Sequence, residues 1–265
     1  MTGEPGLLYA LAGVFGLLFG SFLNVCIYRI PRDLSVVLPR SFCPECGHSI
    51  AGYDNIPLFS YLLLRGRCRA CHRSIGWRYP VVELTTGLLF ALVAWRYGWT
   101  LSALKWAIFE SLLVALFWID LEERLLPDEL TLGGSVLGLL LAVFVPVPGI
   151  LSYVSPVQDG IWVSVANAAV AAGVLGGALW IIRALYQKIR HREGVGLGDV
   201  KLLLLIGAFL GLQNGISGLL IGSVAGTVIS ITFLIVARKD PSTYELPYGT
   251  FLCAGAALIP LLLNA

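Results

Sequence analysis

Long apolar runs recur along the whole 265-residue chain, and they constrain its fold more than any other feature. In lipid only helices and closed barrels satisfy every backbone polar group, and a helix needs about 20 mostly apolar residues to cross the bilayer. Only 13% of the residues are charged, about half the fraction of a soluble domain. The sequence therefore predicts an all-α, polytopic protein of the lipid bilayer. Its eight expected spans are 7–28, 81–97, 100–119, 129–148, 161–186, 200–215, 217–236 and 249–264.

Two of these boundaries rest on local signals. Gln213, Asn214 and Gly215 are typical of a turn, so we expect the run 200–236 to be divided there. The first run is too long for the apolar part of a signal peptide and has no basic segment before it. We therefore expect 7–28 to be retained as the first span.

The basic residues predict the orientation in the membrane. Of the 18 Lys and Arg residues, only Arg96 and Lys105 lie near the connections on one side of the membrane. The other 16 lie in or within a few residues of the alternate connections, which the positive-inside rule places in the cytoplasm, with both termini outside. These cytoplasmic connections are 29–80, 120–128, 187–199 and 237–248.

The only polar stretch long enough to fold is 29–80, so we expect three parts. These are a first span (1–28), a cytoplasmic loop domain (29–80) and a transmembrane domain (81–265). A loop of this size has little core of its own, and a bound metal would supply much of its stability.

Two Cys-x-x-Cys pairs within this loop predict a zinc site. Cys43 and Cys46 are separated by 21 residues from Cys68 and Cys71. Four thiolates complete a tetrahedral structural site and leave no position for a catalytic water. The alternatives are two disulfides or a redox pair, which the expected cytoplasmic side and the short loop disfavour. A basic loop with a zinc ribbon is weak evidence for nucleic-acid binding, which we do not expect.

Two aspartates stand at the ends of apolar runs. Asp120 closes one run and Asp199 opens another. Ionisable groups in membrane helices are costly and usually functional. Two carboxyl groups held together share one proton, so that one activates water and the other polarises a scissile carbonyl. If the two meet, the chain is an intramembrane aspartyl hydrolase.

Each aspartate has a simpler explanation. Asp199 and Lys201 are suited to a charge pair at a helix start, where the dipole favours an acid. Asp120 precedes Glu122 and Glu123 and is suited to ending a span in an acidic loop. Asp128 follows Pro127, as at an ordinary helix start, and is the reserve candidate for the first acid.

Other residues are expected to support the site. Gly196 and Gly198 precede Asp199 and permit unusual dihedrals or close backbone contact. Glu83 stands at the start of the second span and is expected to line a cavity or help to bind substrate. Glycines also recur every four residues, a spacing that lets membrane helices approach closely; they are Gly207, Gly211, Gly215, Gly218, Gly222 and Gly226.

With these residues in order, the chain resembles the type IV prepilin peptidases over nearly its whole length. The resemblance is carried by Gly20-Ser-Phe-Leu-Asn-Val-Cys-Ile-Tyr-Arg29, the two cysteine pairs, Asp54-Asn-Ile-Pro57, Arg78-Tyr-Pro-Val-Val-Glu83, Asp120-Leu-Glu-Glu-Arg-Leu-Leu-Pro-Asp128 and Gly196-Leu-Gly-Asp199-Val-Lys-Leu. It implies that Asp120 and Asp199 are the catalytic pair and that the cysteines hold zinc.

The resemblance also implies an activity and a place in the cell. Such enzymes cut prepilins and pseudopilins of type IV pilus and type II secretion systems after a glycine, at the cytoplasmic face of the bacterial inner membrane. Many also methylate the new N-terminus with S-adenosylmethionine. That cofactor is implied by resemblance alone, and the sequence indicates neither its binding residues nor an oligomeric state.

Two other functions have different sequence requirements. A proton-coupled transporter would use intramembrane acids, but we expect it to show repeated spans with broken helices. A zinc-containing membrane scaffold without activity would not need either aspartate. Neither alternative accounts for the ordered motifs.

Overall fold

The structure, a computed structural model, describes residues 5–154, 160–191, 194, 196–238 and 247–262. Over these residues it contains helices and two isolated bridges but no strand ladder, which confirms the all-α prediction. The chain divides into two compact units that meet in sequence at residues 103 and 104. The expected division at 28 and 80 stays a prediction.

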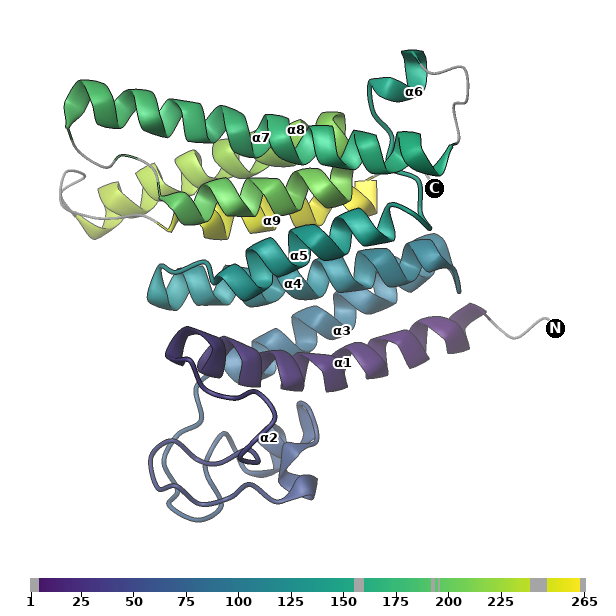
Figure 1. Ribbon diagram of the computed structural model, residues 1–265. Coiled ribbons are helices and arrows are strands. Elements are labelled where there is room, and N and C mark those ends of the chain that lie inside the picture. Colours follow the sequence, from purple (N-terminus) through teal and green to yellow (C-terminus); the bar gives the residue numbers. More distant parts are fainter. Residues whose placement is uncertain (1–4, 155–159, 192–193, 195, 239–246, 263–265) are drawn as a thin grey trace. The chain divides into compact units, whose positions relative to one another are not determined.

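The first unit consists of two packed helices and the loop between them (Figure 1). Helix α1 (Pro5–Arg29) lies along α3 (Arg78–Tyr97). The helices approach closely because Gly16 has no side chain: a Cβ there would lie 2.7 Å from the Thr86 carbonyl oxygen. The loop carries the short helix α2 (Phe59–Leu63) and two 3-10 turns, η1 (Ile30–Arg32) and η2 (Gly52–Asn55).

The second unit is a helical bundle. Its helices are α4 (Leu101–Glu123), α5 (Asp128–Leu141), α6 (Leu151–Val154), α7 (Ile161–Arg190), α8 (Leu197–Ala237) and α9 (Tyr248–Leu262). Helix α8 lies against α5, α7 and α9 (Figure 1). Phe209 of α8 also stacks on Phe109 of α4, with ring centroids 4.8 Å apart.

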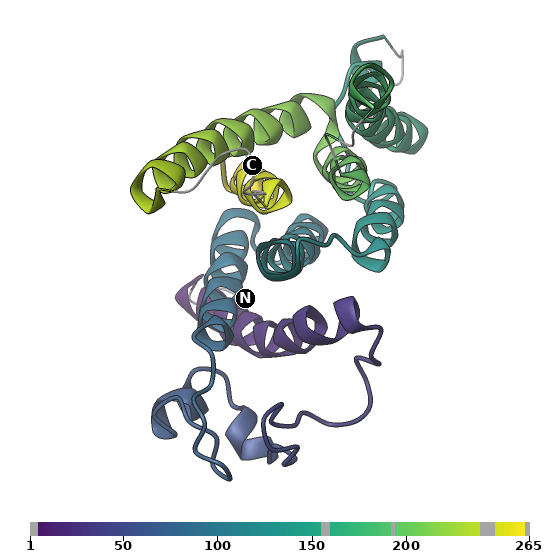
Figure 2. The ribbon, with the colours of Figure 1, turned by 90° about the vertical axis from the view of Figure 1, so that its left-hand side faces the viewer.

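Helix α8 bends where two spans were expected to be separated by a turn. The backbone leaves the helical region at Gly211 (φ 76°, ψ 178°), whereas residues 213–215 are helical. Glycine is needed at the bend because the φ is positive and a Cβ would lie 2.5 Å from the Pro148 carbonyl oxygen. The turn predicted at Gln213–Gly215 is thus a sharp bend two residues earlier (Figure 2).

Two of the regularly spaced glycines lie at close helix contacts. A Cβ on Gly207 would lie 2.6 Å from the Ala172 backbone nitrogen in α7, and one on Gly222 would lie 2.6 Å from the Phe251 carbonyl oxygen in α9. These contacts agree with the role expected of small residues in membrane helices.

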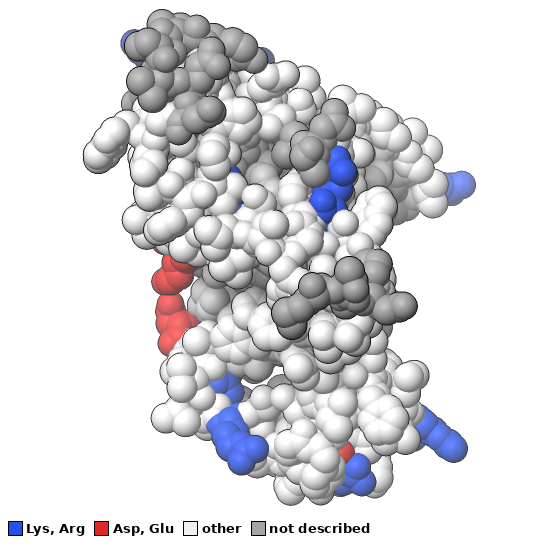
Figure 3. All heavy atoms as spheres, turned by 90° about the vertical axis from the view of Figure 1, so that its right-hand side faces the viewer, with Lys and Arg blue, Asp and Glu red and all other residues white. Residues whose placement is uncertain are grey.

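Four described helical segments are long and apolar enough to cross a membrane: Gly6–Arg32, Leu101–Glu123, Ile161–Arg190 and Leu197–Ala237. Figure 3 shows a face on which uncharged side chains predominate. Helix α5 is only 14 residues long, shorter than the expected span 129–148. Part of the expected cytoplasmic connection 237–248, residues 239–246, lies outside the described residues. The number of spans, eight in our interpretation, stays a prediction.

Candidate active site and metal centre

Asp120 lies in the last turn of α4, where its carboxyl group is buried and held by α9. Its Oδ2 accepts hydrogen bonds from the backbone N–H of Thr250 (2.6 Å) and from the Thr250 hydroxyl (2.8 Å). Thr250 is in the first turn of α9, where backbone N–H groups have no partner within the helix. The start of one helix thus fixes the acid at the end of another.

Asp199 lies in the first turn of α8. Gly196, the residue before the helix, is extended (φ −66°, ψ 145°). Asp199 lies within electrostatic range of Asp120. The second unit therefore places the two predicted acids in the same region.

Leu126 shows how tightly this region is packed. A Cβ on Gly198, next to Asp199, would lie 3.0 Å from the Leu126 Cβ. One on Gly249 would lie 3.0 Å from the Leu126 Cδ1 and 3.1 Å from the Asp120 carboxyl carbon. The two glycines leave room for one leucine side chain between the segments that carry the acids.

Lys201 does not have the partner considered from the sequence. Its Nζ lies 2.5 Å from Oδ1 of Asp128, at the start of α5. Lys201 therefore joins the first turns of α5 and α8, and the reserve acid Asp128 is engaged in this exposed ion pair. The interpretation of Asp199 as the partner of Lys201 is not supported.

Sequence reasoning missed Gly249 and Thr250. Thr250 donates hydrogen bonds to Asp120, and Gly249 leaves room for the Asp120 carboxyl group. Thr250 is 130 residues away from Asp120 in sequence. The only available signal was a glycine and a threonine at the start of the last apolar run, a pattern also typical of an ordinary helix start.

Two further acids are buried elsewhere. Glu83 lies in the first unit, near the start of α3, and accepts a hydrogen bond from the backbone N–H of Leu58 (2.9 Å). Glu110 lies within α4 and is 1% exposed. Neither of its carboxyl oxygens has a hydrogen-bond partner among the described residues.

The four cysteines of the loop form a cluster. Their sulfur atoms all lie within 4.8 Å of one another, with 3.9 Å between those of Cys43 and Cys71. A tetrahedral site with Zn–S bonds of about 2.3 Å places its sulfurs about 3.8 Å apart, so the cluster fits a four-thiolate metal site. All four thiols are free, which contradicts the disulfide alternative.

The backbone around the cysteines supports the same conclusion. Cys43 accepts a hydrogen bond at its carbonyl from Gly47 N–H, and Cys68 accepts one from His72 N–H. The backbone N–H groups of Cys71 and Ala70 donate to the Cys68 sulfur and lower the pKa of Cys68 to about 7. At Cys71 the Arg73 N–H lowers the pKa, but burial and hydrogen bonds with the other three sulfurs outweigh it and raise the pKa to about 11. Thiolates are the metal-binding form.

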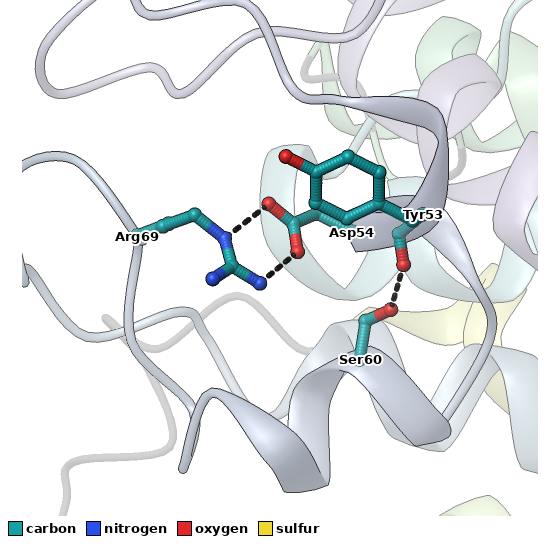
Figure 4. Close-up of polar contacts among 4 residues, drawn as sticks. All are labelled: Tyr53, Asp54, Ser60 and Arg69. Atoms are coloured by element: carbon teal, nitrogen blue, oxygen red, sulfur yellow. Dashed lines mark hydrogen bonds and ion pairs between the residues drawn. The ribbon is translucent and has the colours of Figure 1, made fainter.

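An ion pair stabilises the loop beside this cluster (Figure 4). The Arg69 guanidinium donates two hydrogen bonds, of 2.8 and 2.6 Å, to the Asp54 carboxylate and lies over the Tyr53 ring. These hydrogen bonds lower the pKa of Asp54 below its usual value of 3.8. The Ser60 hydroxyl of α2 donates to the Tyr53 carbonyl (2.8 Å).

Comparison with known proteins covers both units. Residues 14–97 match the bacterial Peptidase A24 N-terminal domain, and residues 106–231 match the type IV leader peptidase family. No solved structure is significantly similar to the chain.

Several curated proteins named prepilin leader peptidase/N-methyltransferase are similar over most of their length. The protein from Pseudomonas putida is 38% identical, over 94% of this chain and 88% of its own length. The protein from Myxococcus xanthus is 41% identical, over 92% of this chain and 69% of its own length. The protein from Neisseria gonorrhoeae is 36% identical, over 86% of this chain and 83% of its own length.

Proposed function

We propose a specific prepilin-processing reaction for this chain, which belongs to the prepilin leader peptidase/N-methyltransferase family. It is an intramembrane aspartic endopeptidase that removes the short basic leader of prepilins and pseudopilins after a glycine. The reaction takes place at the cytoplasmic face of the bacterial inner membrane. The observation that carries this proposal is that the segments bearing Asp120 and Asp199 pack around the same Leu126 side chain, with the two acids within electrostatic range.

In the proposed reaction the two carboxyl groups hold one proton between them, because like charges a few Å apart are not both ionised. The ionised group takes a proton from a water molecule, and the protonated group donates to the scissile carbonyl oxygen. The water oxygen bonds to the carbonyl carbon. The peptide C–N bond then breaks as the leaving nitrogen takes the proton that the base removed from water, and a hydroxyl of the intermediate returns its proton to the other carboxylate. No covalent link between substrate and protein forms.

Thr250 suggests which acid has which role. Its two hydrogen bonds to Oδ2 of Asp120 stabilise a carboxylate better than a carboxylic acid. We assign Asp120 the role of base and Asp199 that of proton donor. Thr250 is a positioning residue, since it acts through Asp120.

The basic connections support a cytoplasmic active site. Arg124 directly follows α4, and Asp120 lies at the same end of that helix. Two exposed acids, Glu122 and Glu123, follow Asp120 and are suited to attract the basic leader of a substrate. If reversing both charges leaves cleavage of a basic-leader peptide unchanged, this part of the proposal is wrong.

We assign the second proposed activity, methylation of the new N-terminus, to the first unit. Cys43, Cys46, Cys68 and Cys71 hold a structural zinc ion that stabilises the loop. S-adenosylmethionine supplies the methyl group for the new N-terminal amine. The loop and the adjoining ends of α1 and α3 bind that cofactor and the amine.

Mass spectrometry of the products tests the function. Purified full-length protein is incubated with a prepilin peptide that carries its leader and the start of its apolar helix. We expect one cut after the glycine, and with S-adenosylmethionine a product heavier by one methyl group. An intact peptide under conditions where a known prepilin peptidase cuts it would favour the scaffold alternative.

A further inference from the structure

Leu126 lies between the segments that carry the two acids, but it takes no part in the proposed proton transfers. It belongs to the non-helical connection 124–127 between α4 and α5. Leu126 is 7% exposed, whereas the preceding Leu125 is 46% exposed. One of two adjacent leucines is therefore turned into the second unit, and its surroundings indicate what it does there.

Leu126 fills the space next to two glycines. A Cβ on Gly198, the residue before Asp199, would lie 3.0 Å from the Leu126 Cβ and 3.2 Å from its Cδ1. A Cβ on Gly249 would lie 3.0 Å from the same Cδ1 and 3.1 Å from Oδ2 of Asp120. Carbon atoms pack at about 3.5–4.0 Å, so neither position has room even for a methyl group. The leucine thus limits the free space at the segments that carry both acids.

Hydrogen bonds hold both ends of the connection, so Leu126 is not free to turn away. On one side the Arg124 N–H donates to the Asp120 carbonyl (2.9 Å). On the other side the Pro127 carbonyl accepts hydrogen bonds from the backbone N–H (3.0 Å) and the hydroxyl (2.9 Å) of the buried Thr131. Close-packed interiors yield little to an added group. A further side chain entering this space would therefore meet a fixed leucine.

The proposed reaction brings one substrate residue into this region. Both carboxyl groups must reach the same scissile carbonyl group, which belongs to the residue before the cleaved bond. In any residue other than glycine, the Cβ lies only about 2.5 Å from the carbonyl carbon. A side chain at that position would therefore begin next to the acids, where Leu126 leaves little room.

We propose that Leu126 determines the specificity for the residue before the cleaved bond, and that it restricts this position to glycine by filling the space that a side chain needs. The inference rests on the proposed peptidase function and deepens it. Leu126 acts through its volume alone, so a smaller residue at position 126 should admit a larger substrate residue. A well-packed site discriminates against one extra carbon by about 10- to 200-fold in kcat/KM, which sets the scale of the effect.

Two peptides that differ by one methyl group test the proposal. Both carry the same basic leader and apolar segment, with glycine or alanine before the cleaved bond, and kcat/KM is measured for each with purified protein in detergent. We expect wild type to prefer the glycine peptide about 10-fold or more, and Leu126→Ala to reduce this preference about 5-fold or more while still cutting the glycine peptide. Leu125→Ala is the matched control, since it removes the same atoms from an exposed neighbour, and it should keep the wild-type preference.

The ratio of the two kcat/KM values within one variant does not change when part of the protein is unfolded. Leu126→Val removes only one carbon and keeps the test decisive if Leu126→Ala fails to fold; its preference should fall by a smaller factor. A wild-type preference in either folded variant, or equal cleavage of both peptides by wild type, would overturn the inference and leave the peptidase function standing. A wild-type protein that cuts neither peptide would overturn the proposed function itself, and the inference with it.

Discussion

Thr250 donates two hydrogen bonds to one oxygen of Asp120, one from its backbone N–H and one from its hydroxyl. Thr250→Val removes only the second, and Thr250→Ser keeps both. A hydrogen bond to a charged group contributes about 1.5–3 kcal/mol. We expect the valine variant to lower kcat about 10-fold or more and the serine variant to stay near wild type. Equal rates in peptide cleavage assays would show that the hydroxyl does not position Asp120.

The contact between α8 and α9 predicts a difference between two glycines. In Gly222→Ala the new methyl group would meet the Phe251 carbonyl oxygen at 2.6 Å, a backbone atom that cannot move alone. We expect a loss of about 1–3 kcal/mol in the free energy of unfolding. Gly173→Ala is the matched control, since nothing lies within 4 Å of its Cβ position. Melting curves in detergent should show a lower Tm only for the first variant.

The cysteine cluster predicts how the two proposed activities separate. Cys43→Ala and Cys68→Ala each remove one of four sulfurs that lie within 4.8 Å of one another. We expect zinc to be lost and methylation to be abolished, because the loop needs the metal to fold. Cleavage should fall less, since the aspartates are in the second unit. Zinc content by atomic absorption is measured beside both activities. A full zinc content in both variants would contradict the assignment.

The ion pair between Lys201 and Asp128 predicts a small effect. The pair is exposed, with 57% of the Asp128 side chain accessible, and such pairs contribute about 0–1 kcal/mol. We expect Asp128→Asn to lower the cleavage rate by less than about 5-fold. A loss as complete as that expected for Asp120→Asn would make Asp128 the catalytic acid instead.

Much of this architecture follows from local sequence features. Apolar length predicts helices, and the spacing of Cys43, Cys46, Cys68 and Cys71 predicts their cluster because each pair forms its own knuckle. Asp120 and Asp199 were identifiable because acids at apolar runs are costly. Each of these signals lies within a short stretch of chain.

The features that sequence did not reveal depend on contacts between distant segments. The bend of α8 was expected near Gln213 but occurs at Gly211, where the Pro148 carbonyl leaves no room for a side chain. Thr250 is an ordinary residue at a helix start until α9 is placed beside Asp120. Lys201 has its partner, Asp128, 73 residues away, although Asp199 is much nearer in sequence.

The central claim is that Asp120 and Asp199 act as one catalytic pair, and rates of prepilin cleavage in membranes test it most directly. Wild type, Asp120→Asn, Asp199→Asn and the double variant are compared at equal protein level and zinc content. The account predicts that each single variant loses cleavage as completely as the double variant, because neither acid works alone. Substantial cleavage by either single variant would contradict it.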